Sequence, residues 1–171
     1  MQQVKWFERS FNFSGDDNIF PAVRSRLAGT PIRIDHFLQP LEGAILELKP
    51  AGSWSVKEHI GHLGDIESLW QGRLVDILSG TDYLRDADLE NTKTHQANHN
   101  ATPLEELVER FREERRKTMV SLKLLHQADI YKAAKHPRLE TPMRVMDLFQ
   151  FVADHDDHHL VRVEEIVDMV A

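Results

Sequence analysis

Ten histidines occur in this sequence of 171 residues, and several of them recur at the spacing of one helical turn. His155 and His159 lie four residues apart in the segment DHDDHHLVRVEEI, and positions i and i+4 of an α-helix differ by only about 40° around its axis. Both share a helix face with apolar residues such as Leu148 and Val152, so both imidazoles should point inward. Inward imidazoles are costly to bury without partners. The pair therefore either binds a metal ion or forms hydrogen bonds at the edge of the core.

A second pair lies in the segment WSVKEHIGHLGDIE, where His59 and His62 are three residues apart. Both flank the apolar stripe of the helix that this segment predicts. Zinc and its neighbours among the divalent transition metals accept three imidazole ligands and leave further positions open. One histidine of this pair, together with His155 and His159, would complete such a set. Spacing alone does not choose between His59 and His62.

Three other histidines are weaker candidates. His158 is turned about 60° from His155, away from the centre of the apolar stripe. His95 and His99 are four residues apart, but they lie in the polar segment KTHQANHN, where no apolar stripe indicates an inward direction. We expect His95 and His99 to be solvated loop histidines.

The composition limits the chemistry. The sequence contains no cysteine, so a disulfide framework, a zinc–thiolate site and a cysteine nucleophile are excluded, and any thiol must come from outside the chain. The formal net charge of −7 is not typical of a nucleic-acid-binding protein. The sequence does not begin like a signal peptide and has no apolar run long enough for a bilayer. We therefore expect a cytoplasmic protein with no nucleic-acid or membrane partner.

Four helical segments should position these side chains. The first spans about residues 19–38 and is kinked or restarted at residues 29–31, because proline cannot donate a hydrogen bond to the preceding turn. The second begins with a capping box formed by Ser55 and Glu58 and stops at Gly80. Between these features the apolar residues recur with helical period.

The second half of the chain continues the pattern after a polar connection at residues 81–101. The third helix opens with a second capping box, Thr102 and Glu105, and reaches about Leu125. The last helix begins at residues 141–142 and continues to the C-terminal end. No segment alternates with period two for long enough to predict a sheet. We predict an all-α fold, a four-helix bundle with long connections.

The length of 171 residues is that of one domain, and we predict a single domain over residues 1–171. Residues 1–18 should form an irregular N-terminal arm that packs on the bundle through its aromatic side chains. These are Trp6, Phe7, Phe11 and Phe13.

Four segments together resemble the DinB-like superfamily, and within it the YfiT-like branch of metal-dependent hydrolases and bacillithiol transferases. They are SRLAGTPIRI, WSVKEHIGHLGDIESLWQGRL, HPRLETPM and HDDHHLVRV, and the resemblance extends over about residues 23–166. It implies a four-helix bundle with a three-histidine metal site at one end. The histidine directly before leucine in the second-helix motif matches His62, and the first and last histidines of the fourth-helix motif match His155 and His159.

The resemblance also concerns the loop before the last helix. A histidine–proline pair recurs there in the thiol-transferase branch, and here it is His136-Pro137. This implies that His136 contacts the substrate or the thiol. The chain departs from the branch at Asp154, where an aromatic residue commonly precedes the first histidine of the last helix.

Three functions follow from such a site. A divalent ion on three imidazoles, most simply zinc or nickel, can lower the pKa of a coordinated thiol or water molecule. The favoured function is a thiol-dependent S-transferase that joins a low-molecular-weight thiol to small electrophiles. The alternatives are a hydrolase of small amides or esters and a non-catalytic metal-binding stress protein. A homodimer is compatible with the fold, although no residue demonstrates it.

The hydrolase would need a general base, and four carboxylates lie near the histidines in sequence. They are Asp65, Glu67, Asp156 and Asp157, and none has the spacing of the H-E-x-x-H motif. Arg73 and Glu67 also lie close to the face of His62. For these two residues an interhelical ion pair is favoured over a contact to the substrate.

Overall fold

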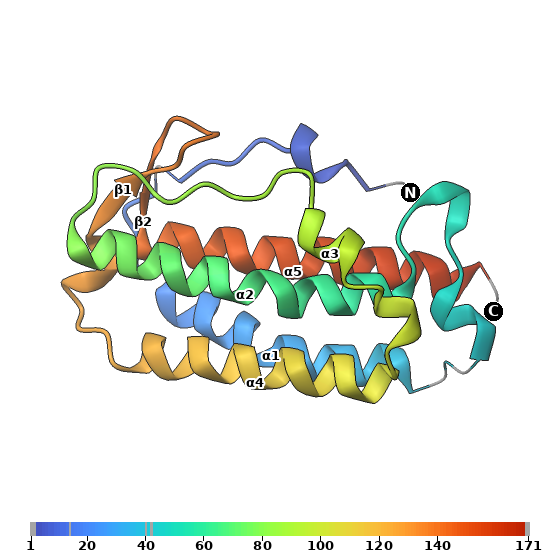
Figure 1. The fold of residues 1–171 in the computed structure, drawn as a ribbon. Coiled ribbons are helices and arrows are strands. Elements are labelled where there is room, and N and C mark those ends of the chain that lie inside the picture. Colours follow the sequence, from blue (N-terminus) through green and yellow to red (C-terminus); the bar gives the residue numbers. More distant parts are fainter. Residues whose placement is uncertain (1–2, 14, 40, 42, 170–171) are drawn as a thin grey trace.

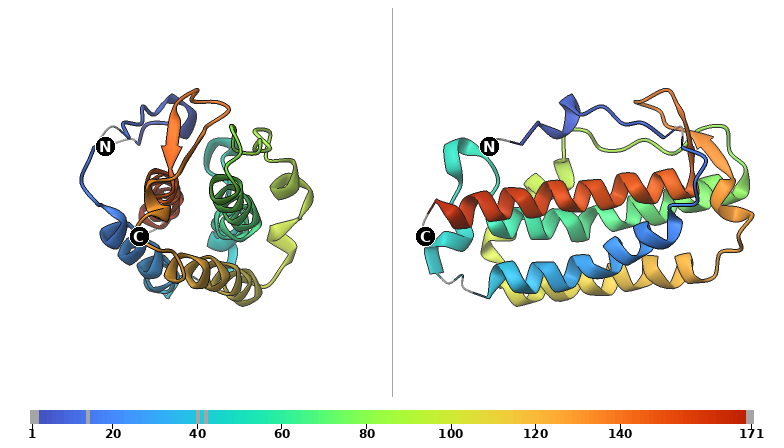
Figure 2. Two further views of the ribbon diagram at one scale, coloured as in Figure 1. Left: turned by 90° about the vertical axis from the view of Figure 1, so that its left-hand side faces the viewer. Right: turned by 180° about the vertical axis from the view of Figure 1, so that it is seen from behind.

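Four long helices form the protein in the computed structural model, which describes residues 3–13, 15–39, 41 and 43–169 (Figure 1). They are α1 (Phe20–Leu38), α2 (Val56–Ser79), α4 (Leu104–Lys123) and α5 (Val145–Asp168). Viewed end-on, they form a bundle in which α2 packs on α4 and α5, and α1 packs on α4 and α5 (Figure 2). The predicted all-α four-helix bundle is confirmed.

Short elements fill the connections between the long helices. The helix α3 (Thr92–Gln96) lies between α2 and α4, and the strands β1 (Ala133–Lys135) and β2 (Pro142–Arg144) pair antiparallel before α5. Short 3₁₀ helices occur at Trp6–Glu8, Gly43–Glu47, Pro50–Gly52, His99–Ala101 and Asp129–Tyr131. Within the described residues, none of the helices combines the length and the apolar character needed to cross a bilayer.

Local signals predicted α1 and α2 well. Ser55 and Glu58 form the expected capping box, and Gly80 ends α2 with φ of +77°, a conformation that glycine adopts without strain. Pro31 lies inside α1, which continues through it rather than restarting. The axis of α1 changes direction along its length (Figure 2), as expected where proline removes a backbone donor.

The predicted ends of the last two helices were wrong. α4 has Pro103 at its N-cap without a side-chain hydrogen bond, so the Thr102 and Glu105 capping box is absent, and the helix ends at Lys123 rather than Leu125. α5 begins at Val145 rather than at residues 141–142, because the preceding residues form β2.

The small sheet was not predicted, because two strands of three residues are too short for a period-two pattern to be visible. Lys135 also exchanges backbone hydrogen bonds with the segment that follows α2: Leu84 donates to its carbonyl and its own amide donates to the carbonyl of Asp82. The loop after α2 and the hairpin before α5 are therefore held together at one end of the bundle (Figure 1).

Two apolar clusters make up the core, one towards each end of the bundle. One surrounds Trp70, Phe149 and Val152, and the other surrounds Ile60 and Phe111. The described part of the N-terminal arm adds Trp6, Phe11 and Phe13 to the first cluster, whereas Phe7 is exposed. The single domain over residues 1–171 stays a prediction.

A layer of buried polar side chains lies between the two clusters. Arg115 of α4 donates to Glu67 of α2 and to Asp156 of α5, and it also reaches the carbonyl of Leu27 in α1. All three charged side chains are at most 2 % exposed. The two carboxylates share one guanidinium, and burial raises the pKa of Glu67, which favours its neutral form.

Candidate metal centre

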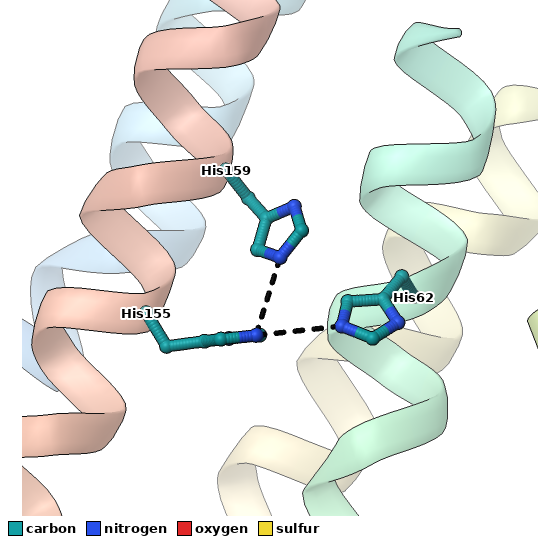
Figure 3. Close-up of side chains that lie close together, drawn as sticks. All are labelled: His62, His155 and His159. Carbon is teal, nitrogen blue, oxygen red and sulfur yellow. Dashed lines mark hydrogen bonds between the residues drawn. The ribbon is translucent and has the colours of Figure 1, made fainter. Parts of the chain in front are cut away.

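His62, His155 and His159 face one another across the interface between α2 and α5 (Figure 3). The Nε2 atom of His155 lies 3.4 Å from Nε2 of His62 and 3.2 Å from Nε2 of His159. One ring nitrogen of each of the three lies within 4.8 Å of the others, and all three residues are buried. The inward direction of His155 and His159 follows from their shared face on α5.

Neighbouring side chains hold the imidazoles of His62 and His159 with their Nε2 atoms directed at the space between the three histidines. The Nδ1 atom of His62 is 2.9 Å from the hydroxyl of Thr94 in α3. The Nδ1 atom of His159 is 2.8 Å from Nδ1 of His59. The Nδ1 atom of His155 is buried and has no hydrogen-bond partner among the described residues. Such outer contacts fix ring orientation and tautomer in metal sites.

The spacing of the nitrogen atoms fits a single small ion. Ligand nitrogens that surround zinc tetrahedrally at 2.0–2.1 Å are separated by about 3.3–3.4 Å. The two measured Nε2 separations, 3.4 Å and 3.2 Å, agree with that value. The three nitrogens come with no carboxylate in the group, and such an imidazole set suits zinc, nickel or copper better than magnesium or calcium.

Burial keeps these imidazoles neutral. Desolvation lowers the pKa of His62 to about 4, although the charge of Asp65 opposes the change. Desolvation, and the nearby histidines, bring the pKa values of His155 and His159 well below the ordinary value of 6.5. At neutral pH the three rings therefore carry free lone pairs, which is the form that binds a metal ion.

A cavity of about 1250 Å³ opens beside the three histidines. Its walls include all three tryptophans of the chain, Trp6, Trp54 and Trp70. The Trp6 and Trp70 rings lie 5.0 Å and 5.6 Å from the ring of His155, and the Trp54 ring stacks on His159 at 5.8 Å. The imidazoles therefore meet a space with largely apolar walls, where a small molecule could bind beside them.

The histidines predicted as weaker candidates lie outside the three-nitrogen group. His95 is exposed, as expected, but it lies in the short helix α3 and not in a loop. The expectation that His99 is a solvated loop residue was wrong: it is 2 % exposed, and its Nε2 lies 2.8 Å from the carboxylate of Asp65. His158 is buried but is not part of the three-nitrogen group. The sequence could not indicate the burial of His99, because α2 covers it from outside its own segment.

The four carboxylates considered as general bases are all engaged in ion pairs. Asp65 pairs with Lys93 and Arg110. Glu67 and Asp156 share Arg115. Asp157 pairs with Arg26 and Arg33. The interhelical ion pair favoured for Glu67 is formed with Arg115 of α4, whereas Arg73 forms no ion pair with the described residues.

His136 lies in the cavity wall away from the three-histidine group. Its Nδ1 atom accepts hydrogen bonds from the backbone amides of Arg138 and Leu139, each at 3.2 Å. Its Nε2 atom lies 3.1 Å from the guanidinium of Arg73. Desolvation, followed by the charges of Arg73 and Arg138, lowers the pKa of His136 to about 4.

Sequence reasoning missed two residues that contact the site. Thr94 was hidden in a polar connection, and its contact with His62 depends on the docking of α3 on α2. Trp6 was predicted to pack on the bundle, but no pattern in the sequence indicates that its ring contacts His155 and His158.

The fold and this buried group define a four-helix-bundle protein with three convergent histidines. Residues 26–161 match the sequence profile of the DinB superfamily, and the chain belongs to that family. The resemblance inferred from the sequence is thereby confirmed. No protein of curated function matches the chain.

Among solved structures the chain is similar to YfiT from Bacillus subtilis. That protein is described as a probable metal-dependent hydrolase with an unusual four-helix bundle topology. The two share 15% sequence identity with a TM-score of 0.81, and the match covers 95% of this chain and 93% of the other. At this identity the likeness shows a common fold.

Proposed function

We propose that this chain is a divalent-metal-dependent enzyme in which His62, His155 and His159 hold one zinc or nickel ion. The proposal is carried by the convergence of three neutral imidazole nitrogens at separations that fit one ion. A divalent ion held in this way supplies a Lewis acid that favours the deprotonated form of a bound thiol or water molecule. The neighbour described as a probable metal-dependent hydrolase supports metal dependence.

Within this class we propose a thiol-dependent S-transferase that acts on small electrophiles. The engagement of Asp65, Glu67, Asp156 and Asp157 in ion pairs supports it, because a hydrolase would need one of them as a general base. A transferase needs no such base, since the thiol brings its own nucleophile. The cavity of about 1250 Å³ exceeds the usual space for one drug-sized ligand, and so has room for a thiol and an electrophile together.

The second candidate is a hydrolase of small esters or amides, which the description of YfiT favours. A non-catalytic metal-binding protein is the third. In all three the three-histidine site is the same, so metal binding and activity need separate tests.

The first test concerns the metal. Elemental analysis of the purified protein should find about one divalent ion per chain, and replacing His62, His155 or His159 singly by Ala should abolish it, because two imidazoles bind much more weakly. His95→Ala is the matched control, since His95 is exposed and outside the group. His59→Ala should weaken affinity about 10- to 100-fold through the loss of its contact with His159. Full metal content in His155→Ala would contradict the ligand assignment.

The second test concerns the reaction. The metal-loaded protein should accelerate conjugation of monochlorobimane to a small thiol, and the rate should be lost in His62→Ala. The chain has no cysteine, so the protein cannot supply the thiol itself. Hydrolysis of p-nitrophenyl acetate in the absence of thiol, lost in His62→Ala and inhibited by added thiol, would instead establish the hydrolase. Inactivity in both assays with full metal content would favour the binding protein.

A further inference from the structure

Arg73 is a buried cation, and its guanidinium is not in an ion pair with any of the described residues. It lies on α2, is 1 % exposed and lines the same cavity as the three histidines. No carboxylate of the described residues forms an ion pair with it; Asp76, one turn away, is paired with Arg85. Burial lowers the pKa of Arg73 to about 10, so it remains charged at neutral pH. A buried guanidinium without a counter-charge is costly unless a ligand supplies one.

The hydrogen bonds of His136 determine which of its nitrogens carries the proton. Its Nδ1 accepts from the amides of both Arg138 and Leu139, so Nδ1 holds a lone pair. A neutral imidazole with a lone pair at Nδ1 carries its proton on Nε2. His136 therefore offers an N–H donor at Nε2.

The Nε2 donor of His136 faces the guanidinium of Arg73, which is also a donor. The Nε2 atom of His136 and a terminal nitrogen of Arg73 are 3.1 Å apart, and a guanidinium can only donate. Two donors at this separation cannot satisfy each other, but one oxygen that accepts from both would satisfy the pair. Arg138 also lines this part of the cavity and adds positive charge. Asp86 lines it too, but it is exposed and pairs with neither arginine in the described structure.

We infer that Arg73 and His136 form a binding subsite for an anionic oxygen group of the substrate, a carboxylate in the first instance. The inference rests on the proposed function, which says that the other end of the substrate reacts beside the three histidines. The anionic group accepts a charge-assisted hydrogen bond from Arg73 and a second hydrogen bond from Nε2 of His136.

The subsite lies within reach of the three histidines. The Trp70 ring is 5.6 Å from the guanidinium carbon of Arg73 and 5.6 Å from the ring of His155. The guanidinium and the His155 ring are thus separated by no more than about twice that distance. The Phe151 ring, one turn before His155 on α5, packs on His136 at 5.6 Å. A small molecule can therefore place an anionic end on Arg73 and a reacting group beside His155, with its apolar part along Trp70 and Phe151.

The surrounding structure holds the guanidinium in place. The Nε atom of Arg73 donates to the backbone carbonyl of Arg85 at 3.2 Å. Arg85 is itself fixed by Asp76, which accepts from its backbone amide at 2.9 Å and from its guanidinium at 2.7 Å. The Arg85 side chain crosses α2 at Gly72, where a Cβ atom would lie 2.1 Å from it. Arg73 is thus positioned in advance, which reduces the cost of binding.

The test measures binding rather than turnover. Phenylacetate and its uncharged analogue phenylacetamide are titrated into the protein as purified, with tryptophan fluorescence as the signal, because all three tryptophans line the cavity. Phenylacetate should bind and the amide should bind at least 10-fold more weakly. Arg73→Gln should weaken phenylacetate binding at least 10-fold, because it removes the charged guanidinium donor. His136→Phe should weaken it about 3-fold, because it removes a neutral donor. Equal affinity for the acid and the amide would overturn the inference.

Two controls separate the subsite from other causes. Arg162→Gln removes a cavity-lining arginine that is already paired with Glu165, and should change the affinity by less than 2-fold. A loss as large as that of Arg73→Gln would indicate a general charge effect and contradict the subsite. His155→Ala, which should lack the metal, should keep phenylacetate binding within about 3-fold. If binding is lost in His155→Ala but kept in Arg73→Gln, the carboxylate binds the metal and the inference is wrong, while the proposed function survives.

A measurement on the unaltered protein covers the case in which Arg73→Gln does not fold. Nitrogen-15 spectra of the imidazole rings should show His136 protonated at Nε2 and not at Nδ1. A proton at Nδ1 would make Nε2 an acceptor for Arg73, the pair would be satisfied without a ligand, and the inference would be overturned. Conversely, Arg73-dependent binding in a protein that never takes up metal would refute the proposed function and leave the subsite.

Discussion

At the scale of single residues, the site depends on which nitrogen each imidazole presents. The hydroxyl of Thr94 lies 2.9 Å from Nδ1 of His62, and this contact holds the ring with its Nε2 directed at the other two histidines. Thr94 is 4 % exposed, so water does not readily replace its hydroxyl. The orientation of His62 is therefore set by a residue 32 positions later in the chain.

We expect Thr94→Val to lower metal affinity about 10- to 100-fold, because valine keeps the shape of threonine but cannot hold the His62 ring. Competition with a chromophoric chelator measures the affinity, and Thr94→Ser should restore it. Thr92→Val is the matched control in the same short helix: Thr92 is exposed and its hydroxyl contacts Asp88 instead. Unchanged affinity in Thr94→Val would show that Thr94 does not position His62.

At the scale of elements, the polar layer around Arg115 connects all four long helices. Arg115 of α4 contacts α1, α2 and α5 at once, and the hydroxyl of Thr30 in α1 donates to Asp156 at 2.7 Å. Asp156 directly follows His155 on α5, and Glu67 lies on the helix of His62. The layer therefore fixes the two helices that carry the histidines relative to each other.

Arg115→Met should destabilise the protein by about 3–5 kcal/mol, because it leaves the carboxylates of Glu67 and Asp156 buried without a counter-charge. Urea denaturation measures the loss. Arg116→Met is the matched control one position away: its pair with Glu113 is exposed, so the change should stay within about 0.5 kcal/mol. If Arg115→Met lost no more stability than the small change expected for Arg116→Met, the buried layer would not be important for stability.

At the scale of the whole molecule, the buried histidines make stability depend on pH. Desolvation lowers the pKa of His59 to about 3 and that of His62 to about 4 in the folded state, compared with about 6.5 in the unfolded chain. Below about pH 6.5 the unfolded state therefore binds more protons than the folded state. The free energy of unfolding should fall as the pH decreases through about 6.5 towards 4, and it should level off about one pH unit above 6.5.

We expect the metal-free protein to lose up to about 1.4 kcal/mol per pH unit in this window for each such histidine. Urea denaturation at pH 7.5, 6.5 and 5.5 measures the slope, and His59→Gln should reduce it by the contribution of one group. Added zinc should raise stability most at pH 7.5, since protons compete for the same nitrogens at lower pH. Equal stability of the metal-free protein at pH 7.5 and 5.5 would contradict the burial of neutral imidazoles.

Local rules were sufficient where a feature depends on neighbours in the sequence. The helical period placed His155 and His159 on one inward face, and the capping box at Ser55 with the stop at Gly80 bounded α2, because both depend on contacts within a few residues. The same rules failed at Thr102 and at residues 141–142, where a proline N-cap and the pairing of β1 with β2 override the local signal.

Contacts between distant segments had to be decided by the tertiary structure. Helical spacing left His59 and His62 equivalent, and the choice of His62 came from the family resemblance. The packing of α2 on α5 then brings His62 into the three-nitrogen group, while His59 contacts His159 from outside it. The burial of His99 and the facing donors of Arg73 and His136 likewise depend on partners 34 and 63 positions away. Such contacts leave no periodic signal, because each depends on how whole elements dock and not on the residues beside it.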